Sequence, residues 1–202
     1  TRSRLTLLQN EDAMNMPNFG PLEERLGHTF RDRSLLLQAL THRSYLNEHT
    51  DYEYPHNERL EFLGDAVLEL IVTEHLYRSY DNPEGDLTNW RAALVNAKTL
   101  AGIARSLQFE EFLLMSKGEA KDRDSKARMY IMANAIEAII GSIYLDSGTQ
   151  GAENFIHRHI LSHLPKILEL ELYVDAKSKF QETAQELLGV TPTYKVLEEA
   201  GP

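Results

Sequence analysis

Acidic residues interrupt an apolar segment in the first half of the sequence. The segment HNERLEFLGDAVLEL spans residues 56–70 and carries Glu61 and Asp65 among leucine, phenylalanine, valine and alanine residues. Residues four positions apart lie one above the other on an α-helix, so these carboxylates would form a polar stripe. Like charges at this spacing repel, and burying them adds a desolvation cost. The stripe is therefore either a solvated helix face or part of a site that needs acids.

A second apolar segment carries polar residues at a similar spacing. The segment IMANAIEAIIGSIYLD, residues 131–146, is apolar on nearly all sides, which predicts a core helix with Asn134 and Glu137 on one face. A buried glutamate normally needs a partner. If this face packs against Glu61 and Asp65, the four oxygen-bearing side chains suit Mg²⁺ or Mn²⁺. Three arginines leave open the alternative that the acids form only salt bridges: Arg59, Arg91 and Arg128.

The periodicity of apolar residues predicts that helices position these acids and that the class is all-α. The expected helices are one ending near Gly27, one over 32–46 with Asp32 as its N-cap, one over 57–79, one capped by Asp86, one capped by Asn96, one over 129–148 and one over 151–168. Polar or charged loops are expected over 47–57 and 117–128.

The two ends of the chain have a different character. Residues 1–18 lack periodicity and are expected to be a loose N-terminal extension of a main domain over 19–172. From residue 173, an amphipathic helix is followed by an alternating, strand-like segment. This pattern indicates the start of a new α+β domain over 173–202, which is too short to fold alone.

Composition sets limits on location and partners. The 202 residues include no cysteine, no apolar run near the roughly 18 residues of a membrane span, and no secretory signal pattern. A cytoplasmic protein without a membrane partner is expected. The formal charge of −10 argues against nucleic-acid binding, unless a metal ion held by the acids meets the phosphate.

The sequence resembles the ribonuclease III family over most of its length. HNERLEFLGDAVLE is closely similar to the family signature. Four further stretches resemble its other motifs: FRDRSLLLQALTHRSY, EGDLTNWRAALVNAKTLAGIAR, KGE at 117–119 and ANAIEAIIGSIYLDSG. DAKSKFQETAQ and PTYKVLEEAGP resemble the opening of the double-stranded-RNA-binding domain that follows the nuclease domain in bacterial members.

The resemblance implies an all-α endonuclease domain that forms a homodimer. Such an enzyme hydrolyses double-stranded RNA with Mg²⁺, for which Mn²⁺ is a possible substitute. It leaves 5′-phosphates and short 3′ overhangs, and the expected processes are ribosomal RNA and messenger RNA processing. The main alternative is a non-catalytic relative that binds RNA or the ribosome; a helical scaffold protein with buried salt bridges is a third interpretation.

The resemblance also assigns roles to individual residues. Asp65 and Glu137 match catalytic acids, and with Glu61 and Asn134 they match the metal ligands. Asn134 departs from the aspartate of many bacterial members. Phe62 matches an aromatic residue of the dimer interface. Weaker matches to RNA-contacting positions are Thr41, His42, Arg43, Ser44, Glu84, Glu119, Gln181 and Glu182.

Overall fold

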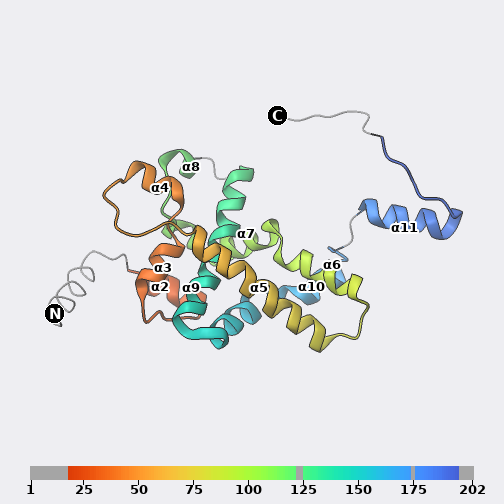
Figure 1. Cartoon of the computed structure of the whole chain (residues 1–202), viewed down its shortest axis with the longest axis horizontal. Coiled ribbons are helices and arrows are strands. Elements are labelled where there is room, and N and C mark those ends of the chain that lie inside the picture. Colours follow the sequence, from red (N-terminus) through yellow and green to blue (C-terminus); the bar gives the residue numbers. More distant parts are fainter. Residues whose placement is uncertain (1–17, 122–124, 174–175, 196–202) are drawn as a thin grey trace.

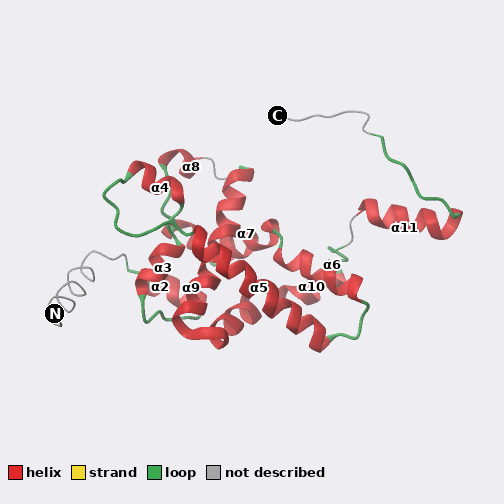
Figure 2. Cartoon of the chain, viewed as in Figure 1, coloured by secondary structure: helices red, strands yellow, loops and turns green. Residues whose placement is uncertain are grey.

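The computed structural model describes residues 18–121, 125–173 and 176–195. Within these ranges the regular structure is helical, as the sequence predicts (Figure 2). Thr41 and Leu114 form an isolated bridge, the one β pairing of the described residues. The expected N-terminal extension lies, apart from Asn18, outside the described residues.

The helices follow one another in a single series (Figure 1). Their bounds are α2 Gly20–Leu26, α3 Arg33–Ala39, α4 Arg43–Glu48, α5 Glu58–Ser79, α6 Glu84–Val95, α7 Ala97–Ser106, η1 Phe109–Phe112, α8 Lys117–Lys121, α9 Lys126–His159, η2 Leu161–His163, α10 Leu164–Glu169 and α11 Ala176–Leu188. The predicted caps of α3 and α7 are confirmed, because Asp32 accepts from Ser34 N and Asn96 from Thr99 N.

The hydrophobic core forms where α5 crosses α9 in the middle of the helical body (Figure 1). Leu68 and Val72 of α5 and Ile136 and Ile139 of α9 are fully buried. Burying each side chain of this kind contributes about 1.5–3 kcal/mol to the free energy of unfolding. Helices α3 and α7 also pack on α9, and α6 packs on α5 and α10.

Two glycines allow α5 and α9 to approach closely. A Cβ atom at Gly64 would overlap the backbone carbonyl of Glu137, and one at Gly141 would overlap the carbonyl of Leu60. A larger residue at either position would force the helices apart, since backbone atoms cannot be moved as easily as a flexible side chain. The crossing therefore depends on glycine, and it lies within one turn of Glu61 and Asp65.

The single helix predicted over 32–46 is wrong, because the chain breaks at Thr41 between α3 and α4. Leu114 N donates to the Leu40 carbonyl at 2.9 Å, and His42 N donates to the Leu114 carbonyl at 2.8 Å. Asn57 N donates to the Thr41 carbonyl at 2.9 Å. These long-range bonds replace helical ones and hold the start of α4 beside the start of α5.

Two further boundaries differ from the prediction. Helix α6 begins at Glu84 after Pro83, so Asp86 lies in the first turn instead of capping the helix. Proline suits this position because it has no N–H and its fixed φ is close to the helical value. The stretch 117–128, predicted as a loop, contains the short helix α8 and the first residues of α9.

The two helices predicted over 129–148 and 151–168 are joined in α9. The chain bends at Gly148, whose φ of 75° is a conformation that glycine adopts easily, and the helix then continues to His159. Beyond His159, η2 and α10 replace the predicted continuation to 168. The prediction that the first helix ends near Gly148 is confirmed, because this residue has non-helical φ and ψ angles and separates two helical segments of α9.

A helix and then a strand were predicted near the C-terminal end, and the helix is confirmed. Helix α11 forms where the amphipathic pattern predicts it, and Phe180, Leu187 and Leu188 are exposed on it. The predicted strand is wrong for the described residues 190–195, which have no regular structure. A strand needs a neighbouring strand to pair its backbone groups, and the described residues contain no strand. Residues 174–175 and 196–202 lie outside the described residues.

Candidate metal centre

One face of α5 carries a continuous line of polar side chains. Glu58, Glu61, Asp65, Glu69 and Thr73 follow one another at spacings of three or four residues. At 3.6 residues per turn, this spacing places all five on the same side of the helix. We call this line the α5 stripe. Its middle lies over the close crossing with α9.

Helix α9 presents two polar side chains at the crossing. From 131 to 143 every residue is buried except Asn134 and Glu137, which are partly exposed. The rest of this segment is apolar or small, as expected of a core helix. Asn134 and Glu137 therefore open onto the same polar junction as the α5 stripe, and the convergence inferred from the sequence is present in the fold.

The electrostatics of the junction show that its acids are close together. Burial raises the pKa of Glu137 to about 7, and the charges of Asp65, Glu61 and Glu69 add to the rise. Burial also raises the pKa of Glu61, and Glu58 and Asp65 act in the same direction. Both carboxyls thus resist ionisation because water is partly excluded and neighbouring charges are negative.

Asn134 acts as a hydrogen-bond donor in this arrangement. Its side-chain amide bonds to the Glu61 carboxylate and lowers the pKa of that group, against the effect of burial. An aspartate here would instead add a fourth negative charge to the junction. Asn134 therefore partly relieves the repulsion that its acidic neighbours create.

The ends of the α5 stripe are neutralised, while its middle is not. At one end Arg43 lies 3.0 Å from Glu58, and at the other end Arg91 lies 3.0 Å from Glu69. Among the described residues, none of the ion pairs includes Glu61, Asp65 or Glu137. The sequence alternative of a purely salt-bridged cluster therefore fails at the junction itself.

The donor set of the junction suits a divalent cation. Three carboxylates and an amide oxygen are hard ligands of the kind that Mg²⁺ and Mn²⁺ prefer. As the side chains stand, no three histidine, aspartate or glutamate residues in the described ranges converge tightly enough to enclose an ion. Burial and the neighbouring acids raise the pKa of Glu137 to about 7, and a bound cation would favour its ionised form.

The residues before and within α4 lie next to the N-terminal end of the α5 stripe. His42 caps α4, with its Nδ1 atom 2.8 Å from the Ser44 hydroxyl. Burial lowers the pKa of His42, and the charges of Glu119 and Glu58 oppose that shift. Glu119 in α8 and Glu58 in α5 thus both lie near the His42 imidazole. The start of α4, the start of α5 and helix α8 therefore meet at this point.

Two of the weaker predictions have a structural explanation instead. Thr41 is fully buried, and its hydroxyl donates to the Leu37 carbonyl at 2.7 Å, so the predicted RNA contact is wrong in this structure. The Ser44 hydroxyl accepts from Ser116 N at 3.0 Å, which ties α4 to the segment before α8. Of this group, Arg43 is the exposed cation, and its guanidinium is paired with Glu58 at 3.0 Å.

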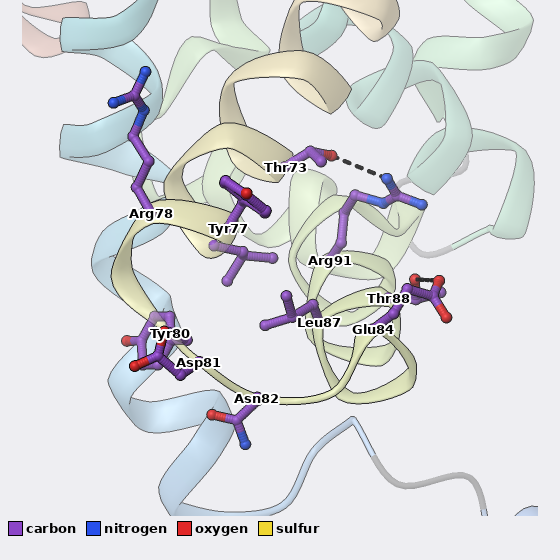
Figure 3. A pocket seen from close by; sticks show the side chains of 11 residues that line it. Thr73, Tyr77, Arg78, Tyr80, Asp81, Asn82, Glu84, Leu87, Thr88 and Arg91 are labelled. Atoms are coloured by element: carbon purple, nitrogen blue, oxygen red, sulfur yellow. Dashed lines mark hydrogen bonds between the residues drawn. The ribbon is translucent and has the colours of Figure 1, made fainter.

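Glu84 lies apart from the junction, at the start of α6. It borders a pocket of about 810 Å³ between the second half of α5 and α6 (Figure 3). Thr88 donates to its carboxylate at 2.8 Å. Two turns further along α6, Arg91 reaches Thr73 at 2.9 Å, drawn as a dashed line in Figure 3. The pocket therefore adjoins the end of the α5 stripe.

The remaining predicted residues lie on other surfaces. Phe62 in α5 is 82% exposed and borders a pocket of about 630 Å³ that Leu145, also exposed, helps to line. Gln181 lies in α11 and is partly exposed, and the side chain of Glu182 is outside the described part of that helix. An exposed phenylalanine beside a hollow with a second exposed apolar side chain is the arrangement expected of an interface residue.

Sequence reasoning left one feature of the site undecided. The sequence offers Arg91 as one of three possible basic partners of the acids, and it does not indicate which acid Arg91 meets because Arg91 lies on a different helix from Glu69. Its seven-residue spacing from Glu84 places both on one face of α6. Only the packing of α6 on α5 identifies Glu69 as the partner of Arg91.

The fold and junction together define an all-α domain with a candidate site for a divalent cation. The family profile described as Ribonuclease-III-like matches residues 32–164, well over half of the chain. The chain therefore belongs to the ribonuclease III family. No helix in the described ranges is long and apolar enough to cross a membrane.

Bacterial relatives named Ribonuclease 3 cover nearly the whole chain. One from Streptococcus gordonii is 43% identical over 184 residues, which is 90% of this chain and 78% of the relative. One from Campylobacter jejuni is 43% identical over 188 residues, or 93% of this chain and 81% of the relative. The chain thus spans about four fifths of the length of these relatives.

Solved structures of a relative agree with the fold. The nuclease domain of ribonuclease III from Campylobacter jejuni has a TM-score of 0.65 at 44% identity, covering 74% of this chain and 98% of that domain. A second structure of this nuclease domain, with a TM-score of 0.64, shows structural flexibility in a region involved in dimer formation. The prediction of an all-α ribonuclease III nuclease domain is confirmed.

Proposed function

We propose that this chain is a Mg²⁺-dependent endoribonuclease that hydrolyses the phosphodiester bonds of double-stranded RNA. Membership of the ribonuclease III family supports the enzyme class. The observation that best supports the proposed site is the polar junction at the α5–α9 crossing. There, three neighbouring carboxylates have no basic partner among the described ion pairs, and the pKa of Glu137 is raised to about 7.

Glu61, Asp65 and Glu137, with the amide oxygen of Asn134, would hold the cation, and Mn²⁺ could replace Mg²⁺. When bound, Mg²⁺ supplies Lewis acidity and neutralises negative charge on the phosphate group. We assign catalytic roles to Asp65 of α5 and Glu137 of α9 because they sit at the junction, where no ion pair of the described residues neutralises the acids. Their carboxylates orient the attacking water and accept its hydrogen bonds.

The neighbouring residues position the substrate. Arg43 is exposed beside Glu58 and offers N–H groups to a backbone phosphate. His42 is half-buried, and because its Nδ1 lies against Ser44, its Nε2 is the nitrogen available to RNA. Glu119 of α8 lies near His42, and Glu84 of α6 borders the pocket beyond the end of the α5 stripe. We assign both weaker roles in contacting the RNA strand.

The product pattern follows from a paired arrangement of sites. Two copies of the domain that meet through Phe62 would cut both strands, giving 5′-phosphates and short 3′ overhangs. The exposure of Phe62 and Leu145 supports such a homodimer, as does the dimer-forming region of the Campylobacter jejuni nuclease domain. The proposed setting is the processing of ribosomal and messenger RNA in the cytoplasm.

We further propose the domain limits 19–172 for the nuclease domain and 173–202 for the start of a double-stranded-RNA-binding domain. Helix α11 supports this assignment, because the exposed side chains of Phe180, Leu187 and Leu188 need a covering that the described residues do not supply. Gln181 and Glu182 would be the RNA contacts of that helix.

The test is cleavage of an end-labelled RNA duplex at low salt with Mg²⁺, with EDTA and with the Glu137→Gln variant. The wild type should cut in Mg²⁺ to staggered ends and should be inactive in EDTA. Glu137→Gln should slow cleavage roughly a thousandfold, because a charge next to the reacting phosphate is lost. The control is Glu74→Gln, which removes an α5 acid already paired with Arg78.

Glu74→Gln should cleave like the wild type. A folded Glu137→Gln variant with full activity would contradict the assigned site. A folded wild type that binds the duplex but does not cut it in Mg²⁺ or Mn²⁺ would contradict the proposed activity. That result would favour the non-catalytic alternative. Cleavage restored by Asn134→Asp would show that the lack of an acid at position 134 is the cause of the inactivity.

A further inference from the structure

Arg91 joins α6 to the end of the α5 stripe. Its Nε atom lies 3.0 Å from a carboxylate oxygen of Glu69, and its guanidinium donates to the Thr73 hydroxyl at 2.9 Å. Figure 3 shows the guanidinium at the edge of the pocket between α5 and α6, turned toward Thr73. Glu69 is one turn from Asp65, so this cation lies directly beyond the unneutralised junction.

Stability is a weak explanation for this position. The side chains of Arg91 and Glu69 are 35% and 39% exposed, and ion pairs with this degree of exposure contribute only about 0–1 kcal/mol. A guanidinium has five N–H groups in a planar fork, and the bonds to Glu69 and Thr73 use two of them. The others are available to a ligand without breaking either bond.

The charge of the surroundings identifies the ligand class. A phosphate placed at the junction is followed along its strand by further phosphates, which the glutamates of the α5 stripe repel. The chain carries a formal charge of −10, so attraction cannot come from the protein as a whole. A planar guanidinium at the end of the stripe binds a phosphate well, and the adjoining pocket of about 810 Å³ leaves room for the strand to continue.

We propose that Arg91 binds a backbone phosphate of the RNA strand next to the bond that is cut. This inference rests on the proposed function and adds a substrate-binding residue to it. Arg91 holds the strand in register with the junction, while Glu69 and Thr73 hold the guanidinium in place. Arg43, at the opposite end of the α5 stripe, contacts the same backbone on the other side.

The chain offers a matched control in Arg78. Its guanidinium also pairs with a glutamate of α5, with two N–H groups 2.7–2.8 Å from the carboxylate of Glu74. Nine residues, or two and a half turns, separate Glu74 from Asp65, so Glu74 lies on the side of α5 opposite the stripe, although Arg78 itself lines the same pocket as Arg91. The control therefore separates a cation held beside the junction from a cation elsewhere at the pocket. In Figure 3 the Arg78 side chain extends away from Arg91.

The experiment measures the affinity of the full chain for an RNA duplex in EDTA at several salt concentrations. Arg91→Gln should weaken binding about tenfold, and the slope of log affinity against log salt should fall by about one. Arg91→Lys keeps the charge but loses the fork, so it should retain the wild-type slope with intermediate affinity. Arg78→Gln should match the wild type in both measures.

Thermal unfolding of each variant separates binding from folding. A purely structural role would lower the melting temperature of Arg91→Gln and leave the salt slope unchanged, which would overturn the proposal. Equal slopes for Arg91→Gln and Arg78→Gln would also overturn it. If Arg91→Gln does not fold, Arg91→Lys decides: affinity equal to the wild type would count against the phosphate contact. These outcomes are distinct from failure of the proposed function, in which the wild type does not cleave.

Discussion

Two acids of the same helix have opposite properties. Asp146 and Glu137 lie nine residues apart in α9, and both are shielded from solvent. Burial raises the pKa of Asp146, but N–H bonds from Asp32 and Arg31 and the nearby His28 outweigh it, so the net pKa is lowered. The Glu137 carboxyl has only carboxylates among its charged neighbours, and its pKa is raised to about 7.

The difference shows how the fold separates structural acids from functional ones. Asp146 accepts from Arg31 N at 3.0 Å and from Asp32 N at 2.9 Å, and its carboxylate lies 3.0 Å from His28 Nε2. Fixed donors satisfy this carboxylate and tie the start of α3 to α9. Within the part of the chain that the structure describes, Glu137 has no such donors, so its charge is costly until a ligand arrives. An acid that costs stability in this way is typical of an active site.

The first prediction concerns the satisfied acid. Asp146→Asn should lower the free energy of unfolding by about 2–3 kcal/mol, because an amide cannot accept from two backbone N–H groups and His28 in the same way. Urea unfolding at pH 7 measures this change. Asp51→Asn, at an exposed loop position, is the control and should change stability little.

The wild-type advantage of Asp146 should also depend on pH. Its folded-state pKa is depressed below the ordinary 3.8, so its contribution is present above pH 3.8 and is lost as pH falls through the folded value. If Asp146→Asn lowers the free energy of unfolding by less than about 0.5 kcal/mol at pH 7, Asp146 behaves like an ordinary surface acid. The proposed difference between Asp146 and Glu137 would then be wrong.

The second prediction removes the unsatisfied acid. Without divalent cations, Glu137→Gln should raise the free energy of unfolding at pH 8 by roughly 2 kcal/mol, after allowance for solvent at this half-buried site. Since the folded pKa of about 7 exceeds the ordinary 4.5, the wild type loses stability as pH rises through this window. The gain should shrink toward zero near pH 4.

Denaturant unfolding in EDTA at pH 4, 6 and 8 measures this profile, with Glu74→Gln as the control on the other face of α5. Mg²⁺ should then stabilise the wild type by mass action and the Glu137→Gln variant much less. A Glu137→Gln variant that is less stable than the wild type at pH 8 in EDTA would mean that Glu137 is satisfied and that the contrast is wrong.

The third prediction makes the junction less satisfied. Asn134→Asp replaces the donor to Glu61 with a fourth carboxylate, so the metal-free protein should lose about 1 kcal/mol of stability at pH 8. The Mg²⁺ concentration for half-maximal cleavage should fall in the same variant. Thermal unfolding in EDTA and a Mg²⁺ titration measure the two effects, and a variant more stable than the wild type would contradict the role given to the Asn134 amide.

The main elements could be predicted from local patterns. Helix α5 was expected over 57–79 and is observed over Glu58–Ser79, because its apolar periodicity and the loop before it are both local signals. The break at Thr41 could not be predicted, since it results from hydrogen bonds to Leu114 and Asn57, which are distant in the sequence. The strand predicted after α11 is absent from the described residues for a related reason, because a strand needs a neighbouring strand to pair with.

The sequence by itself determined the helical class, the family and the identity of the acids, because helical periodicity and motif spacing are properties of neighbouring residues. It also indicated that Glu61 and Asp65 share a face. Only the tertiary structure decided which acids stay without a partner. That outcome depends on the glycine crossing of α5 and α9 and on arginines from α4 and α6, whose distances no local pattern sets.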